Sequence, residues 1–165
     1  MRYLILVILV ASLSYSCSST KFKDEPYLSK SNNSDLKLNI FVPKKISKEK
    51  LPVLLFVHGG NWNTGNKNMY GFIGRNFAKK AVIPIIPTYT LSPNANYDQM
   101  TQEIAQAIRW TKENIKNYGG NSEMIFVTGH SAGGHLVALA TLNPIYKVPP
   151  NTVSGIILND AAGLD

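Results

Sequence analysis

One stretch in the second half of the chain constrains the fold more than any other. It joins a short apolar run at 124–127 to an apolar segment at 136–142 through the residues TGHSAGGH. Strand, Gly-x-Ser-x-Gly and helix, in that order, place a serine on a sharp, strained turn at the carboxyl end of a sheet. Gly129 and Gly133 have no Cβ, so strand and helix can approach closely around Ser131. The stretch therefore predicts Ser131 as a nucleophile.

A second motif supplies donors for the oxyanion that forms when such a serine attacks a carbonyl. Residues 58–62, HGGNW, directly follow the apolar run VLLFV, which is typical of a strand buried on both faces of a parallel sheet. Glycines such as Gly59 leave backbone N–H groups unshielded, and a loop of this HGGG type holds the oxyanion in hydrolases with a nucleophile elbow. The predicted donors are the N–H groups of Gly60, Asn61 and Ala132.

A nucleophilic serine also needs a base and a group that orients the base. The chain has 3 histidines, at positions 58, 130 and 135. His58 is expected to brace the glycine loop, His130 to leave the turn in a different direction from the serine, and His135 to pack on the helix behind it. None is predicted as the base, because geometry comes before pKa. Asp160 and Asp165 are weak candidates for the acid, and the alternative is that both are loop carboxylates.

Apolar runs and helical periodicity alternate along the chain from residue 53 onward. An alternating segment at 36–42 predicts a half-exposed antiparallel strand at a sheet edge, with a hairpin partner opening at Tyr27. The whole pattern predicts an α/β fold, with a mostly parallel sheet and helices on both faces. Buried strands are expected at 53–57, 81–86, 124–127 and 155–159, and helices at 68–80, 97–118 and 136–142.

Together these motifs resemble the alpha/beta-hydrolase superfamily, in its carboxylesterase and hormone-sensitive-lipase-like branch. Feruloyl-esterase-like and kynurenine-formamidase-like enzymes belong to this branch. The resemblance covers about residues 36–165. Its matching pieces are residues 58–62, 89–93 leading into 108–110, and 129–136. The chain departs from the family pattern at Thr90, Asn94 and Asn61, where members often carry arginine, an acid and glycine.

The resemblance implies an acid and then a histidine after the last predicted strand. The chain has no histidine after His135. We therefore expect it to be the amino-terminal portion of a hydrolase, cut after about the sixth strand, and to be inactive as this fragment. The expected substrate is a small carboxylic ester, or an amide as the nearest variant, cleaved through an acyl-enzyme on Ser131. Side chains and water suffice for this chemistry, so no cofactor is expected.

The amino terminus predicts export. A short basic start, an apolar run and small polar residues fit a signal peptide over residues 1–16. Cys17, the single cysteine, follows directly and resembles the lipidated cysteine of bacterial lipoproteins. We expect lipidation at Cys17, a flexible tether over 17–30 and a hydrolase domain over 31–165. Ordinary signal-peptidase cleavage is the alternative and would leave a secreted or periplasmic protein.

Charge and spacing argue against other classes. The formal net charge is +7, but the lysines are scattered and not interleaved with aromatic residues, so no nucleic-acid partner is expected. His130 and His135 are five apart with no glutamate between them, so no metal site is expected. A second hypothesis stays open: an exported lipoprotein of the same fold that binds a polysaccharide or a partner and catalyses nothing.

Overall fold

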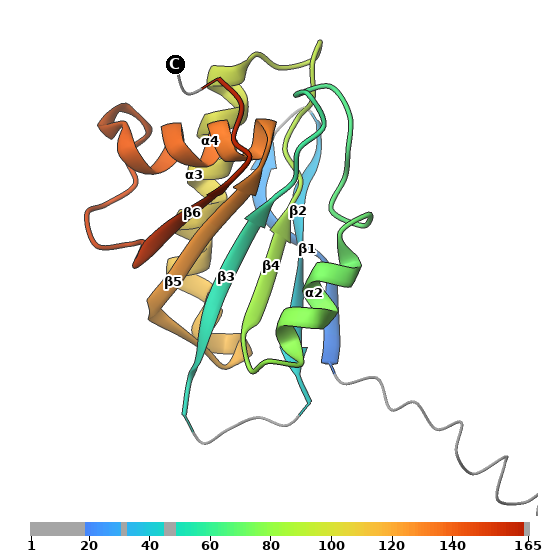
Figure 1. The fold of residues 1–165 in the computed structure, drawn as a ribbon, viewed down its shortest axis with the longest axis vertical. Helices are drawn as coiled ribbons and strands as arrows, with labels where there is room; N and C mark the ends of the chain where they lie inside the picture. Colours follow the sequence, from blue (N-terminus) through green and yellow to red (C-terminus); the bar gives the residue numbers. More distant parts are fainter. Residues whose placement is uncertain (1–18, 31–32, 45–48, 164–165) are drawn as a thin grey trace, which may run out of the picture.

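The computed structural model describes residues 19–30, 33–44 and 49–163. These residues form one 6-stranded sheet with helices packed on it (Figure 1). The strands lie in the order β1-β2-β4-β3-β5-β6. Strands β3 to β6 run parallel, whereas β2 runs antiparallel to both of its neighbours, β1 and β4. The predicted mostly parallel sheet is confirmed. The strand bounds are Ser19–Lys30, Asn33–Pro43, Leu51–Val57, Ile83–Pro87, Gly120–His130 and Gly155–Asn159, for β1 to β6 in turn.

The first hairpin corrects the predicted amino-terminal boundary of the domain. β1 pairs with β2 from Ser19, opposite Pro43, to Lys30, opposite Asn33. Residues 19–30 are therefore part of the sheet and not a flexible tether. The folded domain extends to Ser19 instead of beginning at residue 31. The predicted signal peptide and Cys17 lie outside the described residues.

β2 lies inside the sheet, although its alternating sequence predicted an exposed edge. The edge position belongs to β1, and β2 is sandwiched between β1 and β4. Asn39, a polar residue of the alternating segment, is fully buried. Its side chain accepts a hydrogen bond from the Asp24 N–H at 3.2 Å and donates one to Asn68 Oδ1 at 3.1 Å. A buried amide is tolerated here because both of its polar ends are satisfied.

Helices cover both faces of the sheet, as predicted. α2 (Gly71–Ala78) packs on one face, and α3 (Tyr97–Asn114) and α4 (Ala132–Leu142) pack on the other (Figure 1). On the α2 side, the Phe41 ring occupies the space where a side chain on Gly74 would lie. The missing Cβ therefore lets the helix approach the sheet closely. Two short 3-10 helices, η1 (Ile115–Tyr118) and η2 (Pro144–Tyr146), complete the described helical segments.

The core explains the continuous apolar run in β3. Val53, Leu55 and Val57 face the cluster that contains α3 and α4, and Phe56 faces the smaller cluster under α2. Alternate side chains of a strand point to opposite faces, so a strand covered on both faces is apolar throughout.

α3 has clear signals at both ends. At its start, Asn96 and Gln99 form a capping box, with the Gln99 N–H donating to Asn96 Oδ1 at 2.9 Å and the Asn96 N–H donating to Gln99 Oε1 at 3.1 Å. At its end, the chain tightens into η1 and stops at Gly119, whose φ is 81°. The predicted helix over 97–118 thus consists of an α-helix and a final 3-10 turn.

β6 differs from the prediction of a buried strand. It lies at the end of the strand order, next to β5 alone. The side chain of Ile157 is 54% exposed and that of Leu158 is 39% exposed. Within the described residues, no helix has the length and apolar character needed to cross a membrane.

Candidate active site

Ser131 occupies a strained turn between β5 and α4. Its φ is 52° and its ψ is −123°, a conformation that costs a non-glycine residue free energy and persists only where the surrounding structure enforces it. The enforcement is visible in the backbone. The Ser131 N–H donates to the Asn159 carbonyl at 3.0 Å, and the Ser131 carbonyl accepts from the Gly134 N–H at 2.8 Å. The end of β6 and the first turn of α4 therefore clamp the serine.

Close backbone packing at two glycines seats this turn against the end of β3. A methyl group on Gly129 would collide with the Gly133 carbonyl, and one on Gly133 would collide with the Val57 and His58 carbonyls. No side chain fits at either position. Gly129 therefore brings α4 close to β5, as predicted, and Gly133 also brings α4 close to the end of β3.

The glycine loop after β3 lies beside the serine. A methyl group on Gly59 would lie 3.1 Å from the Ser131 Cβ. The loop turns through positive φ angles of 126° at Gly60, 51° at Asn61 and 59° at Trp62. In the part of the chain that the structure describes, neither the Gly60 nor the Asn61 N–H donates to a backbone carbonyl. The loop that contains Gly60 and Asn61 therefore begins beside Ser131, at Gly59.

The third predicted donor belongs to α4. Ala132 is the first residue of that helix, and the first N–H groups of a helix have no partner within it. They also carry the positive end of the helix dipole, which favours negative charge.

Hydrogen bonds to the Gly60 carbonyl fix the shape of the glycine loop. The Gly60 carbonyl accepts from the Thr64 N–H at 2.9 Å and from the Thr64 hydroxyl at 2.9 Å. These bonds turn the Gly60 carbonyl toward Thr64. The fixed turn keeps the loop's shape without drawing on the N–H groups of Gly60 or Asn61.

The His58 side chain supports the glycine loop at Gly59. Its side chain is buried, and Nδ1 lies 2.9 Å from the Gly59 carbonyl, to which it donates. The ring stacks on Tyr89, with 4.6 Å between centroids, and on Tyr70, with 5.8 Å. Burial lowers the pKa of His58, and the hydrogen bond to Gly59 opposes that shift in part. The ring is thus held neutral within an aromatic stack.

A second set of contacts that supports the glycine loop comes from α3, and the sequence analysis does not predict it. Glu103 is buried, and its carboxylate accepts from the Thr90 N–H at 2.6 Å and from the Thr90 hydroxyl at 2.9 Å. Tyr89, the residue before Thr90, donates its hydroxyl hydrogen to the His58 carbonyl at 3.1 Å. Burial raises the pKa of Tyr89, so its hydroxyl stays protonated. An acidic residue next to Ile104 in the inward stripe of a helix was the one available signal.

Within the described residues, none of the three histidines is hydrogen-bonded to the Ser131 hydroxyl. The His58 Nδ1 donates to the Gly59 carbonyl instead, and the His135 Nδ1 has no hydrogen-bond partner. Asp160 is exposed, with a φ of 49°, and it makes no hydrogen bond to a histidine within the same residues. Asp165 lies outside the described residues.

His135 packs against aromatic residues beside the glycine loop. Its ring meets Trp62 edge to face, with 5.6 Å between centroids, and lies 6.1 Å from Tyr97. Its Nδ1 and the Trp62 Nε1 are buried and have no hydrogen-bond partner among the described residues. Burial lowers the pKa of His135, which favours the neutral ring.

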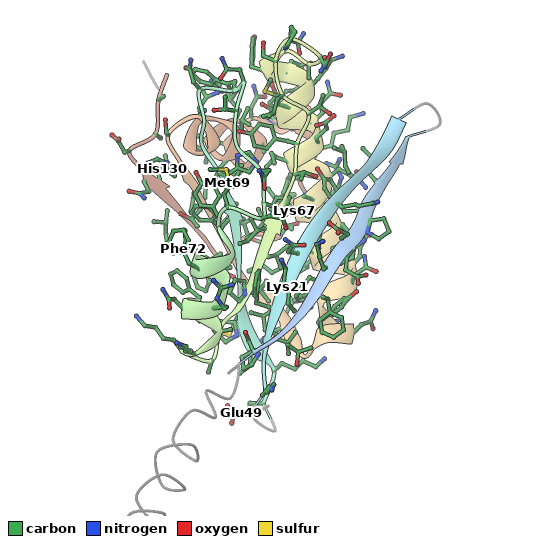
Figure 2. All side chains as sticks on the ribbon, turned by 90° about the vertical axis from the view of Figure 1, so that its right-hand side faces the viewer. Lys21, Glu49, Lys67, Met69, Phe72 and His130 are labelled. Atoms are coloured by element: carbon green, nitrogen blue, oxygen red, sulfur yellow. The ribbon has the colours of Figure 1, made fainter. Side chains whose placement is uncertain are left out.

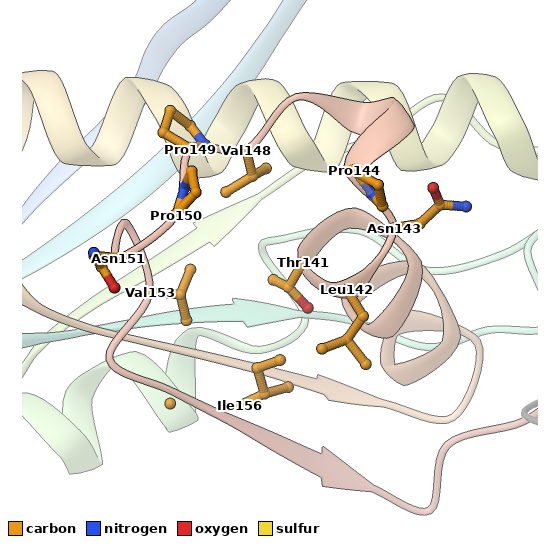
Figure 3. Close-up of a pocket in the computed structure, with 11 residues that line it drawn as sticks. Thr141, Leu142, Asn143, Pro144, Val148, Pro149, Pro150, Asn151, Val153 and Ile156 are labelled. Carbon is orange, nitrogen blue, oxygen red and sulfur yellow. The ribbon is translucent and has the colours of Figure 1, made fainter.

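A pocket of about 520 Å³ lies away from this site (Figure 3). It is bounded by the end of α4, the proline-containing loop that follows and the start of β6, and Ser131 does not line it. The described residues contain no group of three or more His, Cys, Asp or Glu side chains placed to hold a metal ion.

The strained serine after β5 and the glycine loop after β3, on this sheet, define an active site of the alpha/beta-hydrolase type. The chain belongs to the BD-FAE family, whose model matches residues 38–150. The match includes the glycine loop, the buried strands and the serine motif. The predicted family resemblance is confirmed.

The relatives found by sequence are carboxylic ester hydrolases. Gut esterase 1 of Caenorhabditis elegans is 33% identical over 129 residues, which cover 72% of this chain and 23% of that protein. The probable carboxylic ester hydrolase LipM of Mycobacterium tuberculosis is 37% identical over 94 residues, which cover 56% of this chain and 22% of that protein. The chain thus spans less than a quarter of the length of these relatives.

Solved structures with the same fold are also esterases. An inhibited esterase B from Lactobacillus rhamnosis superimposes with a TM-score of 0.76 at 20% identity, covering 95% of this chain and 55% of that one. The esterase Est2 of Thermogutta terrifontis gives a TM-score of 0.74 at 24% identity, covering 87% of this chain and 53% of that one. At these identities the likeness establishes the fold, and it confirms the predicted fold class.

Proposed function

We propose that this chain carries the nucleophile and the oxyanion donors of an exported serine esterase. The observation that carries the proposal is the strained backbone of Ser131, with a φ of 52°, beside the glycine loop. Within the described residues, the Gly60 and Asn61 N–H groups of this loop donate to no backbone carbonyl. A protein that only binds needs neither feature. The family membership and the esterase relatives support the same reaction class.

The proposed reaction begins with attack of the Ser131 hydroxyl oxygen on the carbonyl carbon of a small carboxylic ester. The negative charge that develops on the carbonyl oxygen is held by the N–H groups of Gly60, Asn61 and Ala132, each worth about 3 kcal/mol of transition-state stabilisation. The alcohol leaves with a proton, and water then attacks the acyl-enzyme to release the acid and restore Ser131. An amide would follow the same path with an amine as the leaving group.

The serine proton needs an acceptor, and the placements of His58, His130 and His135 do not provide one. We propose that an acid and a histidine in the family's order, after β6, complete the site. The 165-residue chain by itself is accordingly expected to be inactive on esters. Its nucleophile is positioned but not activated.

We further propose that the protein is exported and anchored through a lipid on Cys17. The support is the basic and apolar start of the sequence, followed by small polar residues and a single cysteine. Cleavage by an ordinary signal peptidase would instead release the domain as a secreted or periplasmic protein. Mass spectrometry of Cys17 in the native protein decides between them, because a diacylglyceryl group adds a defined mass.

A fluorophosphonate probe tests the esterase proposal on the native protein purified from its own cells. We expect covalent labelling of the peptide that contains Ser131, and loss of the label in Ser131→Ala. Ser154→Ala, at an exposed serine outside the site, is the matched control and is expected to keep the label. An unlabelled native protein would refute catalysis and favour the binding role.

Ester hydrolysis tests the expectation for the chain of 165 residues. This chain is expected to hydrolyse 4-nitrophenyl acetate no faster than its own Ser131→Ala variant. Turnover that disappears in Ser131→Ala would show that one of the three histidines serves as the base after all.

A further inference from the structure

The parallel strands give the domain two opposite sides, one at the carboxyl ends of these strands and one at their amino ends. Ser131 and the glycine loop lie at the carboxyl ends of β5 and β3, and this side is called the carboxyl edge. The opposite side, where the chain enters these strands, is called the amino edge. Figure 2 shows the separation, with His130, the neighbour of Ser131, high in the molecule and Glu49 at its lower end.

Lysines gather at the amino edge because the segments that lead into successive parallel strands each carry them. Lys44 follows the end of β2, and Lys50 directly precedes β3. Lys79 and Lys80 follow α2 and lead into β4, and Lys116 lies in η1, which leads into β5. All of these lysines are exposed. The scattered lysines of the sequence are therefore brought to one side by the topology of the fold.

Acidic residues at this edge do not cancel the positive charge. Glu123, near the start of β5, is paired with a further lysine, Lys112, at 3.0 Å. Glu49 lies between Lys44 and Lys50 in the sequence. Glu113 lies in the last turn of α3, just before η1, and Glu25 accepts a hydrogen bond from the Tyr118 hydroxyl of η1 at 3.0 Å. The lysines still outnumber the carboxylates, so the amino edge is net positive; the lysines are Lys44, Lys50, Lys79, Lys80, Lys112 and Lys116, and the carboxylates are Glu25, Glu49, Glu113 and Glu123.

The folded chain also begins at the amino edge. β2 runs antiparallel to β4, with Ile40 opposite Ile85, so the end of β2 at Pro43 lies beside the start of β4. Ser19 pairs with Pro43. The first residue of β1 is therefore on the lysine-rich side of the domain, opposite Ser131.

This placement leaves almost no spacer between the domain and a lipid on Cys17. Only Ser18 lies between Cys17 and Ser19, and the two residue steps from Cys17 to Ser19 reach at most about 7 Å when extended. An anchor at Cys17 would thus hold the amino edge against the lipid headgroups. Each lysine close to an anionic membrane strengthens binding about fivefold, and the effect fades within a Debye length of about 8 Å at physiological salt.

We propose that the amino edge, defined by Lys44, Lys50, Lys79, Lys80 and Lys116, is a docking surface for anionic phospholipid headgroups. Docking there turns the carboxyl edge away from the membrane, so Ser131 faces substrates in the aqueous phase. The proposal rests on the proposed export and anchoring, and it is independent of esterase activity.

Vesicle binding tests the surface with the chain from residue 17 onward carrying Cys17→Ala, so that neither lipidation nor the apolar start of the sequence contributes. The vesicles contain phosphatidylcholine, with or without about a third phosphatidylglycerol. The test variant is Lys79→Glu with Lys80→Glu. The control is Lys37→Glu with Lys147→Glu, which makes the same change in net charge away from the amino edge. Every variant has the same amino terminus, and its folding is checked by thermal unfolding.

We expect the parent chain to prefer anionic vesicles, and the test variant to lose at least about tenfold in partitioning while the control stays within about threefold. The preference should vanish in about 1 M salt, where the Debye length is about 3 Å. Equal losses in both variants, or a preference that survives high salt, would overturn the proposal. So would binding to an anionic polysaccharide with none to the vesicles.

Orientation is tested separately with a single fluorophore. In the Cys17→Ala chain, a dye is attached through Asn117→Cys at the amino edge or Asn94→Cys at the carboxyl edge; both positions are exposed. Headgroup-labelled quencher lipids are expected to quench the dye at 117 strongly and the dye at 94 weakly. Equal quenching, or the reverse order, would contradict the proposed orientation, and neither readout depends on catalysis.

Discussion

Tyr89 and His58 are joined in two ways. Their rings stack with 4.6 Å between centroids and 23° between planes, and the Tyr89 hydroxyl donates to the His58 carbonyl at 3.1 Å. The His58 ring in turn holds the Gly59 carbonyl. The segment after β4 therefore supports the glycine loop after β3, and the two loops form one unit behind Ser131.

Tyr89→Phe tests this unit, since it removes the hydroxyl and keeps the ring. The His58 carbonyl then loses a buried donor, and we expect the free energy of unfolding to fall by about 1–2 kcal/mol. Urea denaturation measures the change. Tyr97→Phe, at a ring that is 59% exposed, serves as the matched control and should change the free energy of unfolding by less than about 0.5 kcal/mol. Similar effects from both variants would argue against the support.

Glu103→Gln tests the second layer of support. The carboxylate receives two hydrogen bonds from Thr90, and hydrogen bonds to a charged group are stronger than neutral ones. Glutamine keeps one acceptor oxygen and introduces donors where Thr90 also donates. We expect a loss of about 1–3 kcal/mol in the free energy of unfolding. Glu113→Gln, exposed near the end of the same helix, should have almost no effect. A neutral result at Glu103 would refute its role.

The sequence could predict the serine turn and the glycine loop because local backbone requirements select their residues. Gly133 is needed where the Val57 carbonyl approaches, and such a constraint is visible in a short motif. The link between Glu103 and Thr90 is different. It depends on how α3 packs against the segment after β4, and the spacing of the two residues contains no such information.

The second half of β1 contains the predicted hairpin partner that opens at Tyr27, whereas its first half differs from the prediction for a comparable reason. This first half, STKFKDE, is rich in charge, which is typical of a tether. Asp24 has a φ of 61°, and the register shifts between Phe22 and Glu25, so the alternation of a strand is interrupted there. The Asp24 carboxylate pairs with buried Lys67 at 2.7 Å. That contact depends on the tertiary fold and cannot be inferred from the local sequence.

The two histidines with lowered pKa predict a loss of stability in mild acid. Burial lowers the pKa of both His58 and His135 below the ordinary value of 6.5. As the pH falls below 6.5, the unfolded chain binds protons that the folded chain does not. The free energy of unfolding should therefore fall from pH 7 to pH 5, by up to about 1.4 kcal/mol per pH unit for His58 alone. Thermal unfolding across this range measures the slope.

The variant His58→Gln provides the internal check on this pH dependence. It removes one of the two titrating rings, so its stability should depend less steeply on pH between 5 and 7. A wild-type profile that is flat in this window, or one that rises toward acid, would contradict the neutral, buried state of His58.

Two glycines differ sharply in what a methyl group would meet. At Gly133 it would collide with backbone carbonyls, whereas at Gly119 it would find nothing within 4 Å, although φ there is 81°. We expect Gly133→Ala to cost about 3 kcal/mol or more, because backbone cannot move aside easily. Gly119→Ala should cost about 1 kcal/mol for its left-handed conformation. Denaturant titration of the pair tests the close approach of α4 to β3, which equal losses would argue against.

The exposed side of β6 predicts self-association of the chain. β6 ends the strand order, and Ile157 is 54% exposed, so an apolar strand with unpaired backbone groups is open to another copy. Ile157→Lys places a charge on that surface and should raise the monomeric fraction in sedimentation velocity without lowering the melting temperature. Ile156→Lys, one residue earlier, faces the core and should lower the melting temperature instead. If Ile157→Lys leaves the association unchanged, the contact between copies must lie elsewhere on the domain.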